Sequence, residues 1–165
     1  MTSHHIRRAE PADFPVVLSL VEALLAELGE EGEESGELPR DRLAELWRGL
    51  GERHLALLAV APPGAVIGIL TLVENFAFYA HGLYGVINEM YVVPDYRSSA
   101  IGASLIAAAA EHGRSRAWSR IDVTAPEADR WVRSRRFYEK QGFVFAGPKL
   151  KLLLARPPGP PPGGG

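Results

Sequence analysis

The chain has 165 residues, 47% of them hydrophobic and 23% charged, with a formal net charge of −2, which predicts one globular domain with a core of its own. The slightly acidic balance gives no general attraction to nucleic acid, and the lack of cysteine excludes disulfides, thiol nucleophiles and thiolate metal sites. No apolar run is as long as a membrane span and the first residues lack the apolar core of a signal peptide, so we expect a cytoplasmic protein that binds no membrane.

Two helices are predicted after a short strand at residues 6–9. Apolar residues recur at three- and four-residue spacing over residues 11–28, which predicts a helix that ends at Gly29. Residues 29–39 hold five glutamates and no basic residue, which predicts a mobile, solvated loop. This loop either has no specific role or attracts a cationic amine through its charge. A second helix is expected over residues 40–50.

The middle of the chain predicts antiparallel strands. Residues 54–61 and 65–78 are expected to pair as a hairpin around Pro62-Pro63-Gly64, and a third strand follows a turn at His81-Gly82 and ends at Val93. Four aromatic residues surround the second turn and either pack in the sheet or line an acceptor pocket: Phe76, Phe78, Tyr79 and Tyr84.

The strand that ends at Val93 leads through a short turn into a helix. Pro94 cannot continue a strand ladder, and residues 101–117 are helical by composition. Backbone N–H groups converge at the start of such a helix, where the macrodipole is positive, so the turn is predicted to bind an anion. Neither a nucleotide P-loop nor the glycine motif of dinucleotide folds is present.

The C-terminal part predicts one more parallel strand, a helix and two final strands. Residues 120–124 should lie parallel to the strand that ends at Val93, because a helix connects the two. A helix over residues 127–141 is closed by Gly142, and residues 144–154 are expected to supply the last two strands. We therefore expect a single domain over residues 1–155, followed by a disordered tail rich in proline and glycine at 156–165.

Two segments resemble signatures of the GNAT superfamily of acyl-CoA-dependent N-acyltransferases. Residues 92–105 follow the pattern V-x-P-x-x-R-x-x-G-[IV]-G-x-x-[LI], except that Ala100 replaces the first glycine. Residues 137–143 follow the second pattern, F-Y-x-x-x-G-F, and two motifs in the right order are more specific than either alone. The family often has an asparagine at the end of the strand before the second motif, where this chain has Ala125-Pro126-Glu127.

The resemblance implies an α/β (α+β) fold with a central mixed, mostly antiparallel sheet of six to seven strands and about four flanking helices. It implies that the two parallel strands splay apart after Val93 and Thr124, and that the arm of acetyl-CoA lies in the gap. The turn amides would hold the pyrophosphate, while Arg97 either binds phosphate or braces the turn. The residues expected at the cofactor are Tyr91, Val92, Val93, Arg97, Ser98, Ser99, Ala100, Ile101, Gly102, Ala103 and Ser104.

The implied activity is transfer of acetyl from acetyl-CoA to a primary amine of a small molecule or protein, by direct attack through a tetrahedral intermediate. An alkyl amine is mostly protonated at neutral pH, so a base is required, and Glu89 is the best candidate. Alternatively, Glu89 pairs with an arginine or faces solvent. An N–H of Tyr91 or Val92 could hold the oxyanion. Tyr138 matches the family position that often protonates the leaving thiolate, or it simply packs.

Two other functions are alternatives to catalysis. Ala100 and the missing asparagine keep open a non-catalytic acyl-CoA-binding or sensing module of the same fold, whereas a nucleotide-binding protein lacks its glycine motifs. The five histidines have no zinc-site spacing, so no metal is expected. The resemblance also implies a homodimer as a possible assembly.

Overall fold

The computed structural model describes residues 3–29, 39–97, 99–124 and 132–147. Residues 30–38 of the predicted acidic loop, Ser98, residues 125–131 with the predicted start of the last helix, and the domain boundary and tail beyond residue 147 lie outside these described residues. Among the described helices, none combines the length and the apolar character that a bilayer crossing requires.

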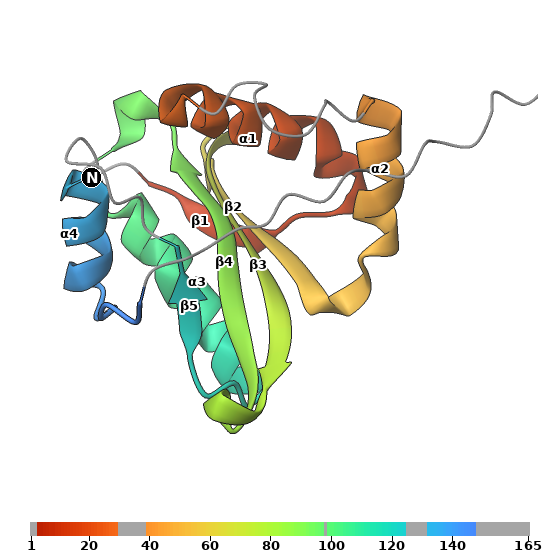
Figure 1. Cartoon of the computed structure of the whole chain (residues 1–165). Helices are drawn as coiled ribbons and strands as arrows, with labels where there is room; N and C mark the ends of the chain where they lie inside the picture. Colours follow the sequence, from red (N-terminus) through yellow and green to blue (C-terminus); the bar gives the residue numbers. More distant parts are fainter. Residues whose placement is uncertain (1–2, 30–38, 98, 125–131, 148–165) are drawn as a thin grey trace, which may run out of the picture.

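Five strands form one sheet in the order β1-β2-β3-β4-β5 (Figure 1). They are β1 (His5–Arg8), β2 (His54–Ala61), β3 (Ala65–Ala77), β4 (Gly82–Val92) and β5 (Ile121–Val123). All neighbours are antiparallel except β4 and β5, which confirms the predicted mixed sheet and its parallel pair. The predicted count of six to seven strands is wrong for the described part, because residues 144–147 form no strand and the rest of the expected last strands lies outside it.

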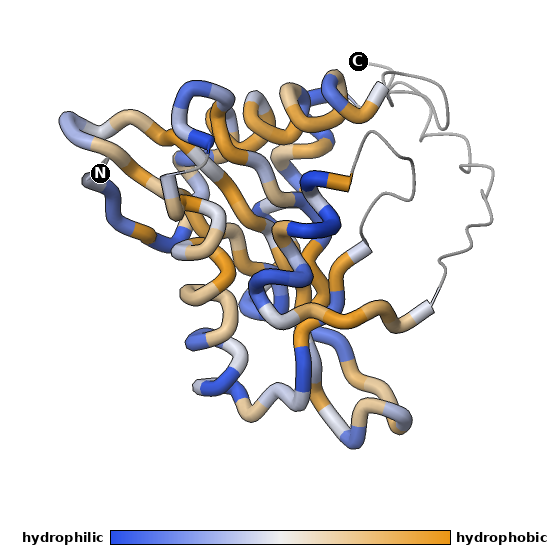
Figure 2. Tube along the Cα trace, turned by 90° about the vertical axis from the view of Figure 1, so that its left-hand side faces the viewer, coloured by the Kyte–Doolittle hydropathy of each residue, from blue (hydrophilic) through white to orange (hydrophobic). Residues whose placement is uncertain are grey.

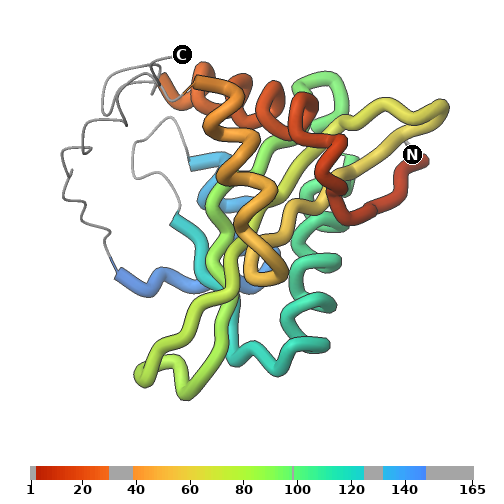
Figure 3. The backbone as a smooth tube through the Cα atoms, turned by 90° about the vertical axis from the view of Figure 1, so that its right-hand side faces the viewer, coloured from red at the N-terminus to blue at the C-terminus, as the bar shows by residue number. Residues whose placement is uncertain are grey.

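Four helices in the described part of the chain flank this sheet, as expected. They are α1 (Phe14–Leu28), α2 (Arg40–Gly49), α3 (Ile101–Ser115) and α4 (Val132–Lys140). Gly29 follows α1 with φ of 70°, a left-handed conformation that ends a helix readily when the residue is glycine. The sheet lies between α1 and α3 (Figures 1 and 3).

Two apolar clusters fill the two sides of the sheet, and hydrophobic segments run through the central strands (Figure 2). The α3-side cluster includes Leu70, Leu72, Ile87, Ile101 and Leu105. The α1-side cluster consists of Val17, Leu20, Leu58, Val60, Ile69 and Tyr91. Burying each large aliphatic side chain contributes about 1.5–3 kcal/mol, so the two clusters fix α1 and α3 against the strands between them.

A β-bulge at Asn88 interrupts the pairing of β3 with β4. Thr71 pairs with Glu89 and Leu72 pairs with Ile87, so Asn88 is an extra residue on β4. An extra residue inverts the alternation of side chains along the strand. Accordingly Ile87 belongs to the α3-side cluster before the bulge, whereas Tyr91 lies in the α1-side cluster after it. The bulge therefore sets which face of the sheet Glu89 occupies.

The end of the sheet farthest from the turn after β4 contains a buried ion pair. Glu74 is 5% exposed and accepts hydrogen bonds from Arg116 Nη2 at 2.9 Å and Trp118 Nε1 at 2.7 Å. These two donors lower the pKa of Glu74 to about 2. The carboxylate therefore ties β3 to the segment that follows α3.

The aromatic residues of the β3–β4 hairpin are mostly exposed. The hairpin extends away from the rest of the sheet (Figure 3), and Phe78 is 88% exposed. Tyr79 is 64% exposed, donates to the Tyr84 hydroxyl at 3.1 Å and lies under the Arg120 guanidinium. The expectation that these rings pack in the sheet is therefore wrong for Phe78 and Tyr79.

Candidate active site

Among the described residues, the edge of β4 that faces β5 has no strand partner near the bulge. The last paired residues of β4 and β5 are Ile87 and Val123, although β4 continues to Val92. Among the described residues, pairing between the two strands therefore ends before Glu89, earlier than the predicted divergence after Val93. Within the described part of the chain, the β5-facing backbone groups of β4 beyond Ile87 therefore have no strand partner next to the predicted site.

The backbone hydrogen bonds on each side of the bulge show which way the amides of β4 point. Gly85 donates to the Arg120 carbonyl on the β5 side at 3.0 Å, whereas Val93 donates to the Ile67 carbonyl on the β3 side at 3.0 Å. Strand alternation then directs the Tyr91 N–H toward β3 and the Val92 N–H toward the open edge. Of the two amides considered for an oxyanion, Val92 is the one the geometry favours.

The N-terminus of α3 presents amides without helical partners. The first bond of the helix runs from Ser104 N–H to the Ala100 carbonyl at 2.9 Å, so the N–H groups of Ile101, Gly102 and Ala103 precede it. Ala100 is the N-cap residue and its methyl group cannot cap them. Its φ of 64° shows that alanine adopts the left-handed conformation in place of the family's usual glycine. Such a terminus favours a bound anion.

Gly102 contributes an N–H group to this terminus, and its lack of a side chain also allows α3 to pack closely against its neighbours. A Cβ at this position would lie 3.0 Å from Met90 Cε and 3.0 Å from Phe137 Cζ. The missing side chain therefore lets α3 approach β4 and α4 together, and any larger residue would displace the Phe137 ring or Met90.

Two serines near the predicted anion site already have protein partners. Ser99 Oγ donates to the Tyr96 carbonyl, and Ser104 Oγ lies 2.9 Å from His4 Nε2. Ser98 lies outside the described residues. The hydroxyls of Ser99 and Ser104 are therefore engaged in internal contacts, which leaves the backbone amides as the main candidates for binding the predicted anion.

Arg97 braces the turn after β4. Its Nε donates to the Val92 carbonyl at 2.8 Å and its Nη2 donates to Glu27 Oε1 at 2.7 Å. The guanidinium also lies 5.2 Å from the centre of the Tyr91 ring, whose hydroxyl donates to the same Glu27 oxygen at 3.2 Å. Burial and the Glu27 charge raise the pKa of Tyr91. Of the two roles expected for Arg97, bracing is the one its contacts support.

Glu89 is half-buried on β4 and its carboxylate accepts a hydrogen bond from Thr71 Oγ1. The expected alternative, pairing with an arginine, is not found among the described residues. The carboxylate lies on the same side of β4 as Tyr91, two residues further along the strand.

Tyr138 lies on the opposite side of β4. Its ring packs between Phe137 and Phe143, with centroids 5.4 and 5.5 Å away, and its Oη lies 3.9 Å from Met90 Sδ. Burial raises the pKa of Tyr138 to about 12, so the phenol keeps its proton at neutral pH. Glu89 and Met90, which Tyr138 contacts, are neighbours on β4. The two predicted catalytic residues therefore lie close to the same part of β4, on its opposite faces.

Thr71, Glu27 and Met90 were missed as members of this site, and two of them carried a signal. Thr71 interrupts an otherwise apolar run in β3, and Glu27 lies in the last turn of α1, where the helix dipole disfavours a carboxylate. A polar residue at such a position indicates a partner elsewhere in the fold. Nothing in the sequence pattern indicated Met90.

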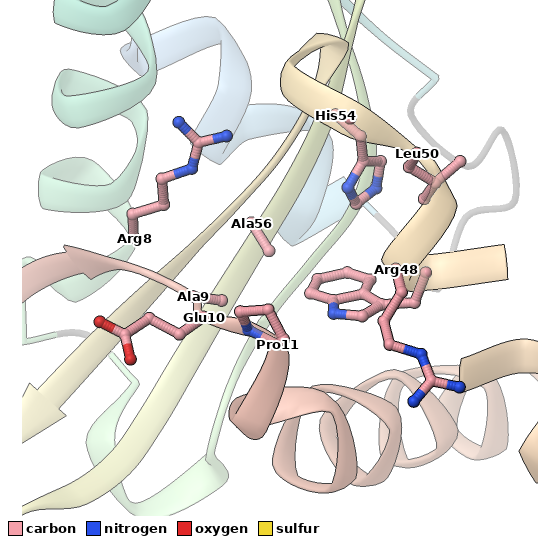
Figure 4. A pocket seen from close by; sticks show the side chains of 10 residues that line it. Arg8, Ala9, Glu10, Pro11, Arg48, Leu50, His54 and Ala56 are labelled. Atoms are coloured by element: carbon pink, nitrogen blue, oxygen red, sulfur yellow. The ribbon is translucent and has the colours of Figure 1, made fainter. Parts of the chain in front are cut away.

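A separate hollow of about 210 Å³ lies at the other edge of the sheet, between β1, β2 and α2. Figure 4 shows His54 and Leu50 on one side of it and Arg8 and Glu10 on the other. None of the predicted site residues lines it. In the part of the chain that is described, no group of three or more His, Cys, Asp or Glu residues could hold a metal ion.

Comparison with known proteins identifies the family. The chain matches the acetyltransferase (GNAT) family over residues 19–143, whereas no curated protein sequence matches it. An aminoglycoside acetyltransferase from an uncultured soil metagenomic sample superposes with a TM-score of 0.76 and 21% identity, over 93% of this chain and 99% of that one.

Two further solved structures have the same fold. A Trypanosoma brucei acetyltransferase has 25% identity and a TM-score of 0.69, over 92% of this chain and all (100%) of that one. An acetyltransferase from Clostridium acetobutylicum, solved with acetyl-CoA, has 18% identity and a TM-score of 0.72, over 92% and 96% of the two chains. With the family match covering most of its length, the chain belongs to the GNAT acetyltransferase family.

Proposed function

We propose that the protein transfers the acetyl group of acetyl-CoA to a primary amine of a small molecule or protein. The observation that carries this proposal is the position of the α3 N-terminus, whose first amides have no helical partner, at the end of β4, whose β5-facing edge is open beyond Ile87 among the described residues. An anion site beside an open strand edge suits a long ligand with a diphosphate at one end.

Acetyl-CoA supplies the activated thioester in this proposal. The N–H groups of Ile101, Gly102 and Ala103 would bind its pyrophosphate, and the open edge of β4 would pair with its amide-containing arm. The small residues at 102 and 103 leave room for close approach to the backbone. Arg97 would keep the turn in shape through the Val92 carbonyl, and the Val93 N–H is already used by Ile67.

Glu89 would act as the base. A free alkyl amine has a pKa of about 10.4, so bringing it to the neutral form at pH 7 costs about 4 to 5 kcal/mol. The half-buried Glu89 carboxylate, on the Tyr91 side of β4, can accept this proton directly or through one water. The Val92 N–H would stabilise negative charge on the reacting carbonyl oxygen, because strand alternation directs it to the β5-facing edge of β4.

Tyr138 would supply a proton to the departing thiolate. Its pKa of about 12 keeps the phenol protonated at neutral pH, and its contact with Met90 places it beside β4 on the face opposite Glu89. A base and an acid on two faces of one strand can act on two ends of the same reacting group.

We propose cationic small molecules as the first acceptors to test. The structurally similar soil protein is named for aminoglycosides, and the acidic sequence at residues 30–37 would attract a cation. A peptide amino terminus fits the same chemistry. A homodimer stays a prediction from the family.

Release of free CoA from acetyl-CoA tests the function directly. The chain has no cysteine, so a thiol reagent such as Ellman's reagent detects only the product. The assay compares an aminoglycoside, spermidine and an alanine-terminated peptide with a reaction lacking amine. Amine-dependent thiol release supports the proposal. Binding of CoA with no turnover on any amine would instead favour the acyl-CoA-binding module, and no CoA binding would overturn both.

A further inference from the structure

Thr71 is the residue that touches the proposed base. It lies on β3 directly opposite Glu89 and is 2% exposed, and it is one of only two polar or charged residues among those described as buried. The other, Glu74, is held by Arg116 and Trp118 at the far end of the sheet. A hydroxyl buried in an apolar strand destabilises the fold unless it has partners. Both hydrogen-bond partners of the Thr71 hydroxyl belong to Glu89, namely its backbone N–H and its carboxylate.

The two hydrogen bonds between these residues have a fixed direction. Glu89 N–H lies 3.1 Å from Thr71 Oγ1, and an amide can only donate, so the hydroxyl oxygen is the acceptor. The single hydroxyl hydrogen of Thr71 is then free to donate a hydrogen bond to Glu89 Oε2. Thr71 therefore stabilises the ionised carboxylate, which is the form a general base needs.

The bulge at Asn88 explains why a side chain occupies this place. The extra residue falls between Ile87 and Glu89, where the regular ladder between β3 and β4 shifts by one position. A bulge commonly leaves a backbone group unpaired and redirects a side chain. Here the Glu89 N–H donates a hydrogen bond to the Thr71 hydroxyl oxygen, and the same hydroxyl donates a hydrogen bond to the redirected carboxylate.

We propose that Thr71 is a positioning residue that orients the Glu89 carboxylate and stabilises its ionised form through this hydrogen bond. The proposal rests on Glu89 being the base of the proposed acetyltransferase. Thr71 itself is 2% exposed, so in this proposal it acts through Glu89 and not by contact with the amine or the thioester.

Other ionisable groups on this face do not replace Thr71. Tyr91 of β4, Glu27 of α1 and Arg97 of the turn contact one another, and Arg97 pairs with Glu27. Among the described residues, Glu89 forms no ion pair, and on the opposite face Tyr138 contacts Met90. The Thr71 hydroxyl is therefore the only described side chain that hydrogen-bonds the carboxylate.

Two matched pairs of proteins test this role in the full chain. Wild type and Thr71→Val differ by a hydroxyl exchanged for a methyl group, and Thr71→Ser and Thr71→Ala differ by the hydroxyl alone. The measurement is the titration of the Glu89 side-chain carboxyl carbon by ¹³C NMR, assigned with Glu89→Gln. This readout requires neither acetyl-CoA nor an acceptor, so it is independent of the proposed function.

We expect the variant that lacks the hydroxyl in each pair to titrate at a higher pH than its partner, because its ionised carboxylate loses the hydrogen bond from residue 71. Thr71→Ser should titrate as wild type does. The acid limb of kcat/KM should move with the midpoint, on whichever panel amine the wild type acetylates fastest.

Either of two results would overturn the proposal. One is an unchanged midpoint in both variants that lack the hydroxyl. The other is an equal shift in Thr71→Ser and Thr71→Ala, which would assign the effect to packing. If Thr71→Val fails to fold, the serine–alanine pair still decides. If wild type acetylates no amine while the midpoints shift as expected, the acetyltransferase proposal fails and the contact between Thr71 and Glu89 stands.

Discussion

Arg97 Nη2 donates to Glu27 Oε1 over 2.7 Å, and this bond joins the turn after β4 to the last turn of α1. The two residues are 70 positions apart in the sequence. The pair lies at the surface, with side chains 40% and 35% exposed, so it adds at most about 1 kcal/mol to stability. Its importance is the shape and charge of the turn beside the α3 N-terminus.

The first prediction separates the charge of Arg97 from its bracing role. Glu27→Gln removes the ion pair and makes the site more positive, so the dissociation constant for CoA should stay the same or fall. Arg97→Glu removes the same pair but places two carboxylates together next to the proposed anion site, and it should weaken CoA binding about tenfold or more. Isothermal titration with CoA measures both. Equal weakening in the two variants would show that bracing outweighs charge.

The second prediction concerns Ala100 and its φ of 64°. A non-glycine residue in the left-handed region is strained by about 1–2 kcal/mol in the folded protein. Glycine removes this strain, but it also makes the unfolded chain more flexible, which offsets part of the gain in stability. We expect Ala100→Gly to stabilise the protein by about 1 kcal/mol and to raise Tm by about 2–4 °C. Thermal unfolding checks this. Ala103→Gly, inside α3, is the control and should lower Tm, because its backbone is helical. A lower Tm in Ala100→Gly would contradict the strain.

The third prediction tests Glu89 as the base. Glu89→Gln keeps the size of the side chain and an oxygen that can accept from Thr71, but it cannot take a proton. We expect kcat to fall about a hundredfold or more, with the acid limb of the pH–rate profile lost and the CoA dissociation constant within twofold of wild type. Steady-state thiol release and titration with CoA measure these quantities. An unaltered pH–rate profile would exclude Glu89 as the base.

The fourth prediction tests Tyr138 as the proton donor. Its pKa of about 12 means that the phenol is protonated at neutral pH and loses its proton only as the pH rises toward that value. Ionisation of Tyr138 should therefore produce no alkaline fall in rate below about pH 11. Tyr138→Phe keeps the ring contacts and should lower kcat about a hundredfold. A variant with wild-type kcat would assign this tyrosine to packing against Phe137 and Phe143.

The fifth prediction concerns the buried Glu74. Its pKa falls from an ordinary value of 4.5 to about 2 in the folded protein, so its contribution is fully present above pH 4.5 and is lost as the pH drops toward 2. We expect Glu74→Gln to lower the free energy of unfolding at pH 7 by about 3 kcal/mol. As the pH falls from 4.5 toward 2, the variant should lose less stability than wild type, because it has no carboxylate to protonate at this position. Chemical denaturation at several pH values measures it. Glu111→Gln, with an 80% exposed side chain, is the control that should change little.

The elements were predictable because local signals define them. Gly29 ends α1, Pro62-Pro63-Gly64 joins β2 to β3, and Pro94 ends β4, each for a reason that acts within a few residues. The parallel arrangement of β4 and β5 also followed from the helix between them.

The details of the candidate site were less accessible, because they depend on contacts between distant residues. The partner of Arg97 lies on another helix, and Thr71 meets Glu89 only because two strands pair with one residue unmatched. No spacing rule specifies which residue of a strand will bulge. The signature located the turn and the helix, whereas the direction of each amide in β4 required the bonds of Gly85 and Val93.

The unmatched residue at position 88 has a consequence for comparing this chain with its relatives. Positions before and after Asn88 follow opposite odd–even phases, so a gap placed one column away in an alignment would assign the role proposed for Glu89 to Asn88 or Met90. In distant homologues, the residue that pairs with the counterpart of Thr71 across the two strands is therefore a safer guide to the proposed base than the alignment column of Glu89.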